Sequence, residues 1–269
     1  MQKVLSLAFF ILISLTGFAQ SKNNQFDSQG RKQGLWEKRL PNGNLIYQGT
    51  FKNDKPVGEF KRYHANGIIK AKLIYTEGSD TIAAELFDSK GKLMAKGHYI
   101  GHTKDGHWKY YKQGQLISEE NYDQGVKNGV SKTYYPTGEL FEETHWKNNQ
   151  KSGIYRAFFK TGKPYMECQM TDGKRNGTCK VYYENGQLEL DGYYWMGLRD
   201  SNWIYTKDNG EYAYTLTYNK GSLQNPEVRD SVQALQMNDL EKKKGTLVDP
   251  EKFMEDPFQY MQKNKMIRR

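Results

Sequence analysis

Short aromatic-rich runs alternate along the chain with polar pairs that end in glycine. Each run is about six to eight residues long and rich in Tyr, Phe and Trp, a composition typical of β-strands. The eight pairs are Asn42-Gly43, Asn66-Gly67, Lys90-Gly91, Gln113-Gly114, Thr137-Gly138, Thr161-Gly162, Asn185-Gly186 and Asn209-Gly210. Six of the seven steps between them are 24 residues and one is 23. A fixed period of this size predicts a repeat architecture.

A second set of markers lies inside each repeat. A leading glycine stands nine residues before most of the pairs, at Gly34, Gly58, Gly129, Gly153 and Gly177, with Gly106 eight before. An aromatic ring follows two residues later in most copies, at Trp36, Phe60, Trp108, Tyr155 and, after Ser201, Trp203. The order predicted for each repeat is therefore strand, tight turn, strand, looser turn. Asn-Gly favours a type I′ hairpin turn, because that turn needs positive φ at both central residues.

A single hairpin is marginally stable in water, so the hairpins must pair with one another. Residues 30–221 are predicted to form an all-β fold, an elongated antiparallel meander of about eight tandem β-hairpin repeats in a single-layer, solenoid-like sheet. The composition agrees with a thin sheet rather than a globule. The mean hydropathy is −0.90, and Tyr (20 residues) outnumbers Phe (12). Tyr suits a sheet with two partly wet faces, because its ring packs while its hydroxyl stays solvated.

The two ends of the chain differ from the repeats. Lys3, the apolar run from Val4 to Leu15 and the small residues up to Gln20 are typical of a signal peptide over residues 1–20. Residues 21–29 are a lead-in. We therefore expect a soluble, exported chain with no transmembrane span after cleavage, in the periplasm, at the cell surface or secreted. An uncleaved anchor or a buried strand is the alternative interpretation of residues 1–20.

Residues 222–269 lose the period and are predicted to form a helical capping segment and a basic tail. Asn225-Pro226 is a helix start signal. Further start signals at Asp249-Pro250 and Asp256-Pro257 indicate two short helical turns. The first helix is expected to cover the edge of the last hairpin, since the ends of a solenoid need capping. Partner binding by the tail, or disorder, is the alternative.

The stretch from residue 47 to residue 67 carries a distinctive order of residues. It has a Tyr-x-Gly-x-aromatic opening, a charged turn, a second glycine and a closing Tyr…Gly, at Tyr47, Gly49, Phe51, Gly58, Tyr63 and Gly67. This order resembles the MORN repeat, and the longer step with Gly-x-Leu after the turn resembles its bacterial variant. The resemblance covers about residues 30–221. The third repeat departs most, because Ile82 replaces the leading glycine and Ala83-Ala84 follow it.

The two cysteines occupy a notable position in the repeat. The predicted register places Gly49 opposite Phe60, and the same offset places Gly97 opposite Trp108 and Gly192 opposite Trp203. In the sixth junction the equivalent residues are Cys168 and Cys179. Directly opposed residues of an antiparallel pair lie near disulfide reach. An exported protein also meets oxidising conditions. We predict a Cys168–Cys179 disulfide, with two free, partly buried thiols as the alternative.

A candidate metal site follows from the same register. His98 is placed opposite His107, with His102 and Asp105 in the intervening turn. Three imidazoles and a carboxylate are ligands that Zn²⁺ or Cu²⁺ accepts. The alternative is that these histidines are amphipathic residues on a wet sheet face.

No catalytic motif is found in the sequence. It lacks Gly-x-Ser-x-Gly, His-Glu-x-x-His and a phosphate-binding glycine loop, and its glycines are spaced for hairpins. No enzymatic activity and no cofactor are expected. The net charge of +9 permits acidic partners, and no nucleic acid is expected.

The sequence favours a non-enzymatic exported scaffold that binds another protein or an envelope component along its aromatic-lined sheet, in the periplasm or at the surface of a Gram-negative bacterium. The resemblance adds an anionic lipid or membrane surface as an alternative ligand. It also adds an antitoxin or immunity-like role, although the signal peptide argues against a cytoplasmic antitoxin.

Overall fold

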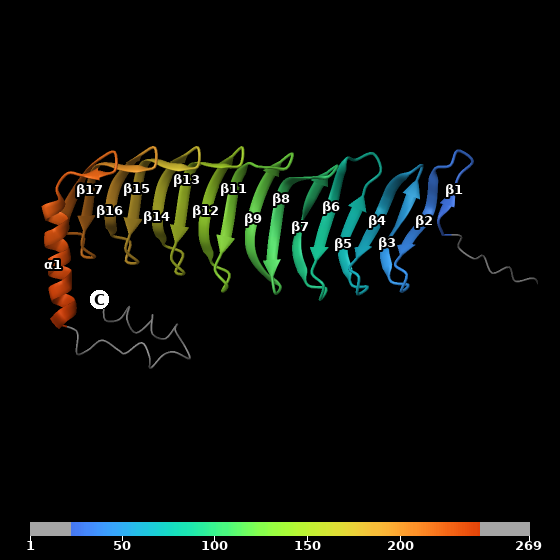
Figure 1. Ribbon diagram of the computed structural model, residues 1–269, viewed down its shortest axis with the longest axis horizontal. Helices are drawn as coiled ribbons and strands as arrows, with labels where there is room; N and C mark the ends of the chain where they lie inside the picture. The colour runs from blue at the N-terminus through green and yellow to red at the C-terminus, as the bar shows by residue number, and fades with distance from the viewer. Residues whose placement is uncertain (1–22, 243–269) are drawn as a thin grey trace, which may run out of the picture. The chain divides into compact units, whose positions relative to one another are not determined.

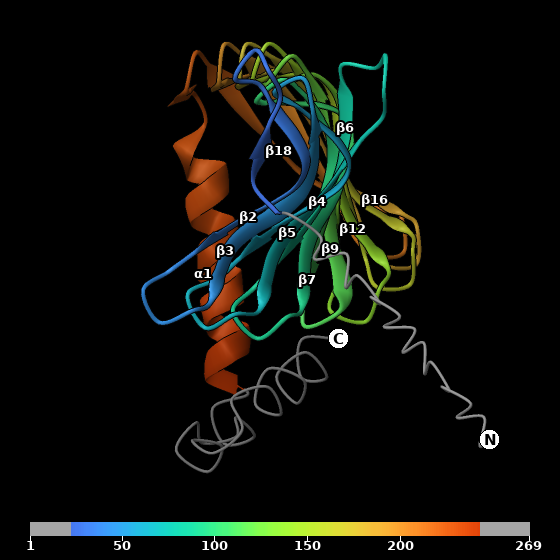
Figure 2. The ribbon, with the colours of Figure 1, turned by 90° about the vertical axis from the view of Figure 1, so that its right-hand side faces the viewer.

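The computed structural model describes residues 23–242 in two compact units, which divide between His102 and Thr103. Within each unit, antiparallel strands follow one another side by side in chain order, and the strands are curved (Figures 1 and 2). The fold is therefore the predicted open antiparallel meander of hairpin repeats, with one short helix after the last strand. The predictions for residues 1–20, for the two short helical turns after residue 248 and for the basic tail concern residues outside the described range.

The described part of the first unit, residues 23–102, contains seven strands. They are β1 (Gln25–Phe26), β2 (Lys32–Arg39), β3 (Leu45–Lys52), β4 (Lys55–Tyr63), β5 (Ile69–Tyr75), β6 (Thr81–Phe87) and β7 (Leu93–Ile100). Each strand pairs antiparallel with the next.

The second unit, as far as residue 242, contains twelve strands and a helix. They are β8 (Thr103–Lys112), β9 (Gln115–Asp123), β10 (Val126–Lys127), β11 (Gly129–Tyr134), β12 (Leu140–Lys147), β13 (Gln150–Phe158), β14 (Pro164–Thr171), β15 (Lys174–Tyr182), β16 (Leu188–Trp195), β17 (Leu198–Thr206), β18 (Tyr212–Asn219), β19 (Ser222–Leu223) and α1 (Pro226–Lys242). The short strand β10 and strand β11 both pair with β9, so they act as one interrupted strand of the meander.

The two kinds of turn are the reverse of the prediction. At the first Xaa-Gly pair, Gly43 N donates to Leu40 O (2.9 Å) and only Gly43 has positive φ, so the loop is a turn with a left-handed glycine after it. Such three-residue loops create a bulge, and the register shifts between Lys38 and Arg39. The type I′ pattern occurs instead at the turns called looser, where Asn53 and Asp54 have φ of 52° and 66°. The pair Gln113-Gly114 differs from the first Xaa-Gly pair, because both of its residues have positive φ.

The leading glycines explain why the predicted register is nevertheless correct. Gly58 has φ of 69° and lies in a bulge of β4, where the pairing shifts from Thr50–Val57 to Gly49–Phe60. The bulge offsets the difference between the expected and the observed turn centre. A residue with a side chain adopts this positive-φ backbone conformation only at a cost in free energy, which explains why glycine is repeated at this position.

The core is a thin layer on one face of each sheet. Buried side chains of the first unit include Trp36, Ala71, Ala84 and Ala95. In the second unit Cys168, Cys179, Tyr194, Trp203 and Leu216 form a buried cluster, and Val228 of α1 packs against it. The helix itself has no buried residue. The edge of β18 pairs with β19 and with the side chain of Asn225, and capping of this edge by α1 stays a prediction.

Candidate functional site

Glycine and aromatic residues face each other across neighbouring strands, as predicted. Gly49 lies in register between Trp36 on β2 and Phe60 on β4. A Cβ atom added at Gly192 would lie 2.6 Å from Cδ2 of Trp203, so this ring lies directly over bare backbone. The third predicted pair, Gly97 with Trp108, has one residue in each unit.

The cysteines take the place of this pair at one junction. Cys168 on β14 is in register with Cys179 on β15, and the two form a disulfide. Both are buried, and Cys179 also pairs with Gly192 on the next strand. The bridge therefore lies within the row of glycines and rings that forms the core.

A row of cations accompanies the rings, and the sequence analysis missed it. The position two residues before the leading glycine, or before Ser201, is basic in six repeats, at Lys32, Lys104, Lys127, Lys151, Arg175 and Arg199. Lys104 Nζ lies 4.9 Å from the ring centroid of Trp108, and Arg199 Cζ lies 4.4 Å from that of Trp203. Cations at such distances are attracted to the ring face. The period that revealed the glycines could have revealed this cation row as well.

In the second unit, the carboxylate of Glu120 offsets the positive charge of Lys104 and Lys127. Lys127 donates to Glu120 (2.7 Å), and Tyr122 donates to the same carboxylate (2.5 Å). Burial raises the pKa of Glu120, but these hydrogen bonds outweigh it and hold the pKa below its usual value. Burial lowers the pKa of Lys104. Arg175 and Arg199, in contrast, form no ion pair with any residue that the structure describes.

The third repeat lacks both the ring and the cation. Ala84 on β6 occupies the position that Phe60 holds on β4, and Asp80 stands where the cation row would continue. In the second repeat Pro56 also replaces the cation. A methyl group therefore lies in the middle of this part of the sheet where the neighbouring repeat has an aromatic ring.

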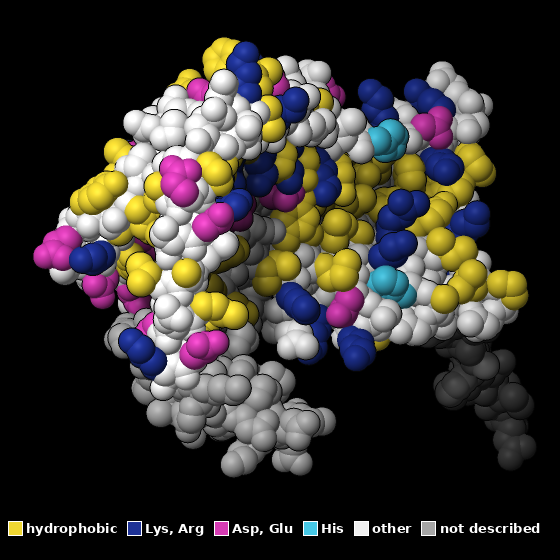
Figure 3. All heavy atoms as spheres, turned by 60° about the vertical axis from the view of Figure 1, so that its left-hand side comes forward, with side chains coloured by type: hydrophobic (Ala, Val, Ile, Leu, Met, Phe, Trp, Pro, Cys, Tyr) yellow, Lys and Arg dark blue, Asp and Glu magenta, His cyan; other side chains and the backbone are white. Residues whose placement is uncertain are grey.

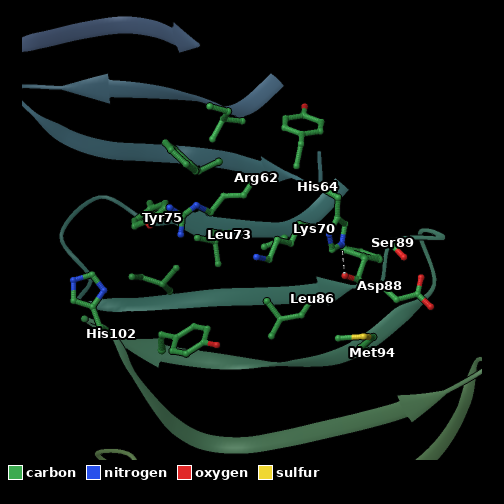
Figure 4. Close-up of a pocket in the computed structure, with 18 residues that line it drawn as sticks. Arg62, His64, Lys70, Leu73, Tyr75, Leu86, Asp88, Ser89, Met94 and His102 are labelled. Carbon is green, nitrogen blue, oxygen red and sulfur yellow. Dashed lines mark hydrogen bonds between the residues drawn. The ribbon is translucent and has the colours of Figure 1, made fainter. Parts of the chain in front are cut away.

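A groove opens over these strands, and we call it the β4–β7 groove. Its volume is about 960 Å³ (Figure 4). Its lining includes Leu73, which is the cross-strand partner of Ala84, and Ile82 and Leu86, which lie two residues on either side of Ala84 along β6. The remaining lining residues are Ile46, Phe60, Arg62, Tyr63, His64, Lys70, Ala71, Tyr75, Phe87, Asp88, Ser89, Met94, Tyr99, Gly101 and His102. The groove thus surrounds the position where the ring is missing.

Polar groups lie around this apolar lining. The Arg62 side chain extends toward Tyr75 (Figure 4). Arg62 and Lys70 have no carboxylate partner among residues 23–242. Asp88 does not neutralise them by contact, because its Oδ1 atom accepts hydrogen bonds from the backbone of Lys90 and Lys92, both at 2.9 Å. The bond from Lys92 is the main reason why the pKa of Asp88 is lowered.

Burial also affects Tyr75 and Tyr99, two tyrosines that line the groove. Burial raises the pKa of Tyr75 and of Tyr99, while the charge of Arg62 opposes the shift at Tyr75. The space-filling view shows a band of hydrophobic side chains on the surface, with Lys and Arg side chains along it (Figure 3). The groove is thus apolar with an excess of positive charge at its sides.

The candidate metal site at His98, His102 and His107 is not supported by the geometry. In the described part of the chain, no group of three or more His, Cys, Asp or Glu side chains is placed to hold a metal ion. His107 Nε2 lies 3.4 Å from Glu119 Oε2, and His102 lines the β4–β7 groove. His98 and His102 belong to the first unit and His107 to the second, so the three-histidine site stays a prediction.

One hairpin turn of the second unit is unusually apolar, and we call it the Trp195 tip. Trp195, Met196 and Leu198 are each about half exposed, at 50%, 50% and 49%. The adjacent turns are held close, since Gly197 N donates to Arg175 O (2.8 Å) and Gly221 N donates to Arg199 O (2.7 Å). These turns bring four cations near the tip, Lys174, Arg175, Arg199 and Lys220, none of which has an ion-pair partner in the described ranges.

The fold defines a β-hairpin repeat protein, and the comparisons identify its family. The model of the MORN repeat variant matches residues 32–53, 56–77, 104–124, 127–148 and 175–196. The chain belongs to this family, whose members are generally non-enzymatic repeat scaffolds. The matches leave out residues 78–103, which contain the repeat without ring and cation, and also residues 149–174. A search of curated proteins found no match. No helix of the described residues is long and apolar enough to cross a membrane.

Proposed function

We propose that this protein is a binding scaffold, and that its β4–β7 groove holds a segment of another protein of the cell envelope. The observation that carries the proposal is the groove itself, which opens where the repeat lacks both its ring and its cation. A functional site is expected where a regular architecture departs from its own rule.

The lining is suited to binding. Tyr75 and Tyr99 offer aromatic surface with a polar end, and the aliphatic floor of Leu73 and Leu86 excludes water. Interfaces draw most of their binding energy from such aromatic and Arg anchors in desolvated pockets. The antiparallel strands fix these side chains in advance, so little conformational entropy is lost on binding.

The test is affinity capture of the mature chain from an envelope extract, with two matched variants. Leu86→Lys places a charge in the groove, whereas Ile74→Lys places one on the opposite face of the neighbouring strand, where Ile74 is already exposed. A partner that is retained by the wild type and by Ile74→Lys, but lost with Leu86→Lys, supports the proposal. A partner that Leu86→Lys retains contradicts it, and the purified partner must reproduce the difference.

We further propose that the chain acts outside the cytoplasm. The signal-like residues 1–20 support this location, and so does a disulfide in the core row, since oxidising compartments sustain disulfides. N-terminal sequencing of the protein from a fractionated cell tests it. A mature chain that starts near residue 20 in the envelope fraction is expected, and an intact Met1 in the cytoplasmic fraction would contradict export.

An anionic membrane surface is the second candidate ligand, supported by the Trp195 tip. Trp enters the membrane–water interface readily, and unpaired cations near it attract anionic headgroups. Co-sedimentation with phosphatidylglycerol vesicles is the test. Binding should fall with added salt and with Trp195→Ser, but not with Phe141→Ser, an exposed aromatic at another site of the same unit. Equal binding by both variants would exclude the tip.

A further inference from the structure

We infer that the β4–β7 groove recognises an aromatic side chain flanked by carboxylates, presented by a short acidic peptide segment. This inference rests on the proposed function and names the chemistry of the ligand. Two independent features carry it, the missing ring of the third repeat and the unpaired cations of the groove.

The missing ring indicates the aromatic part of the ligand. Along β2 and β4 the rings of Trp36 and Phe60 lie on either side of Gly49. The same cross-strand row continues with Leu73 and then Ala84, and at Ala84 the side chain is a methyl group in place of a ring. A ring supplied by a partner would lie over the aliphatic floor between the Tyr75 side and Leu86. Offset or edge-on aromatic contacts stabilise such an arrangement beyond the burial of area.

The unpaired cations indicate the acidic part. Arg62 extends from β4 into the groove toward Tyr75, and Lys70 lies at its side (Figure 4). Neither has a carboxylate partner in the part of the chain that the structure describes. The carboxylate of Asp88 accepts hydrogen bonds from two backbone amides, so it lowers the positive potential without pairing with either cation. A ligand carboxylate beside the ring would give the Arg62 guanidinium the planar acceptor that it fits best.

The size of the groove sets the length of the segment. At about 960 Å³ it lies near the upper end of the range for small-ligand pockets, about 300–1,000 Å³. It therefore has room for a large side chain together with its immediate neighbours, and not for a folded domain. The scaffold is expected to hold its partner by one short exposed segment.

Calorimetric titration with three unlabelled peptides tests the inference. The first is Gly-Ser-Asp-Asp-Phe-Asp-Ser-Gly. The second replaces Phe by Ala and keeps the charge, and the third keeps Phe and replaces every Asp by Lys. We expect the first peptide to bind the mature chain at least tenfold more tightly than either of the others. Similar affinities for the first and second peptides would overturn the aromatic part, and similar affinities for the first and third would overturn the acidic part.

Two variants locate the site. Arg62→Gln should weaken the first peptide about tenfold, because a hydrogen bond to a charged group contributes about 1.5–3 kcal/mol. Lys55→Gln is the matched control, because Lys55 is an exposed residue of the same strand β4 and does not line the groove. Ala84→Phe restores the ring and should abolish binding in a chain that keeps the wild-type melting temperature. Unchanged binding by Arg62→Gln would overturn the inference even if Ala84→Phe does not fold.

The outcomes separate this inference from the proposed function. A captured partner that depends on Leu86, together with three peptides that do not bind, would refute the ligand chemistry and leave the scaffold function standing. A partner that the wild type and Leu86→Lys capture equally would refute the scaffold function at this groove.

Discussion

The side chain of Asn225 completes the edge of strand β18 by hydrogen bonding to it as a neighbouring strand would. Its Oδ1 accepts from Thr217 N (2.8 Å), and its Nδ2 donates to Thr215 O (2.9 Å). In the first unit Asn24 does the same for β2, since it accepts from Glu37 N (2.8 Å) and donates to Glu37 O (3.0 Å). In each unit an amide side chain thus occupies backbone hydrogen-bonding groups of an edge strand. An edge strand whose backbone groups are free is a template for association with another chain.

Removal of this amide should destabilise the second unit and expose its edge. Asn225→Ala loses two hydrogen bonds to backbone groups, so the free energy of unfolding should fall by about 1–2 kcal/mol. Urea unfolding measures the loss, and light scattering measures the self-association that an open edge promotes. Asn219→Ala, at an exposed residue at the end of the same strand, serves as the control. Equal effects of the two substitutions would argue against the edge role.

The disulfide predicts a specific thiol count. The unreduced, denatured chain should show no free thiol, and the reduced chain should show two, since the sequence contains two cysteines. Cys168→Ala with Cys179→Ala should lower the free energy of unfolding by about 2–3 kcal/mol, because the open chain gains conformational freedom. Two free thiols before reduction would refute the bridge.

The contact between Gly192 and Trp203 predicts a steric cost. In Gly192→Ala the new Cβ would collide with the indole, so unfolding should become easier by about 1–3 kcal/mol. Gly186→Ala is the comparison, because its φ is 95° and nothing lies within 4 Å, so only backbone strain acts. The cost at Gly192 should shrink in a chain that also carries Trp203→Leu. If it does not, the ring is not the cause.

Asp27 predicts a stability change in acid. Its pKa is lowered from 3.8 to about 2, mainly because it accepts a hydrogen bond from the Arg31 backbone, with further bonds from Gln33 and Gln29. A carboxyl group with a lowered pKa stabilises the folded chain above its ordinary pKa, and this contribution is lost as the pH falls toward about 2. Thermal melts of wild type and Asp27→Asn should therefore differ at pH 6 and converge near pH 2. A constant difference would contradict the assignment.

The sequence predicts the parts of this fold that depend on periodicity. The period gave the meander, and the register that sets Gly49 against Phe60 and Cys168 against Cys179 is observed. The turn types were wrong because a left-handed glycine serves both a two-residue and a three-residue loop, and the flanking hydrogen bonds decide between them. The bulge at Gly58, which the leading glycine marks in the sequence, then offset the error in the turn centre.

The groove could be predicted only in part. The sequence marks the third repeat as deviant at Ile82 and Ala84, but a missing ring becomes a groove only if neighbouring side chains leave the space open. That depends on the directions of Arg62 and Leu86, which belong to two different strands, β4 and β6. The cation row could have been predicted from the sequence, because Lys104 and Arg199 each stand two residues before the position of the leading glycine.

The central claim, that the β4–β7 groove is where this scaffold binds a protein, is tested most directly by photo-cross-linking. A benzophenone amino acid is placed at position 86 in the groove or at position 74 on the opposite face, and each chain is irradiated in intact cells. The account predicts a discrete cross-linked partner from position 86 and none from position 74. A partner that cross-links from position 74 alone, or equally from both positions, would contradict it.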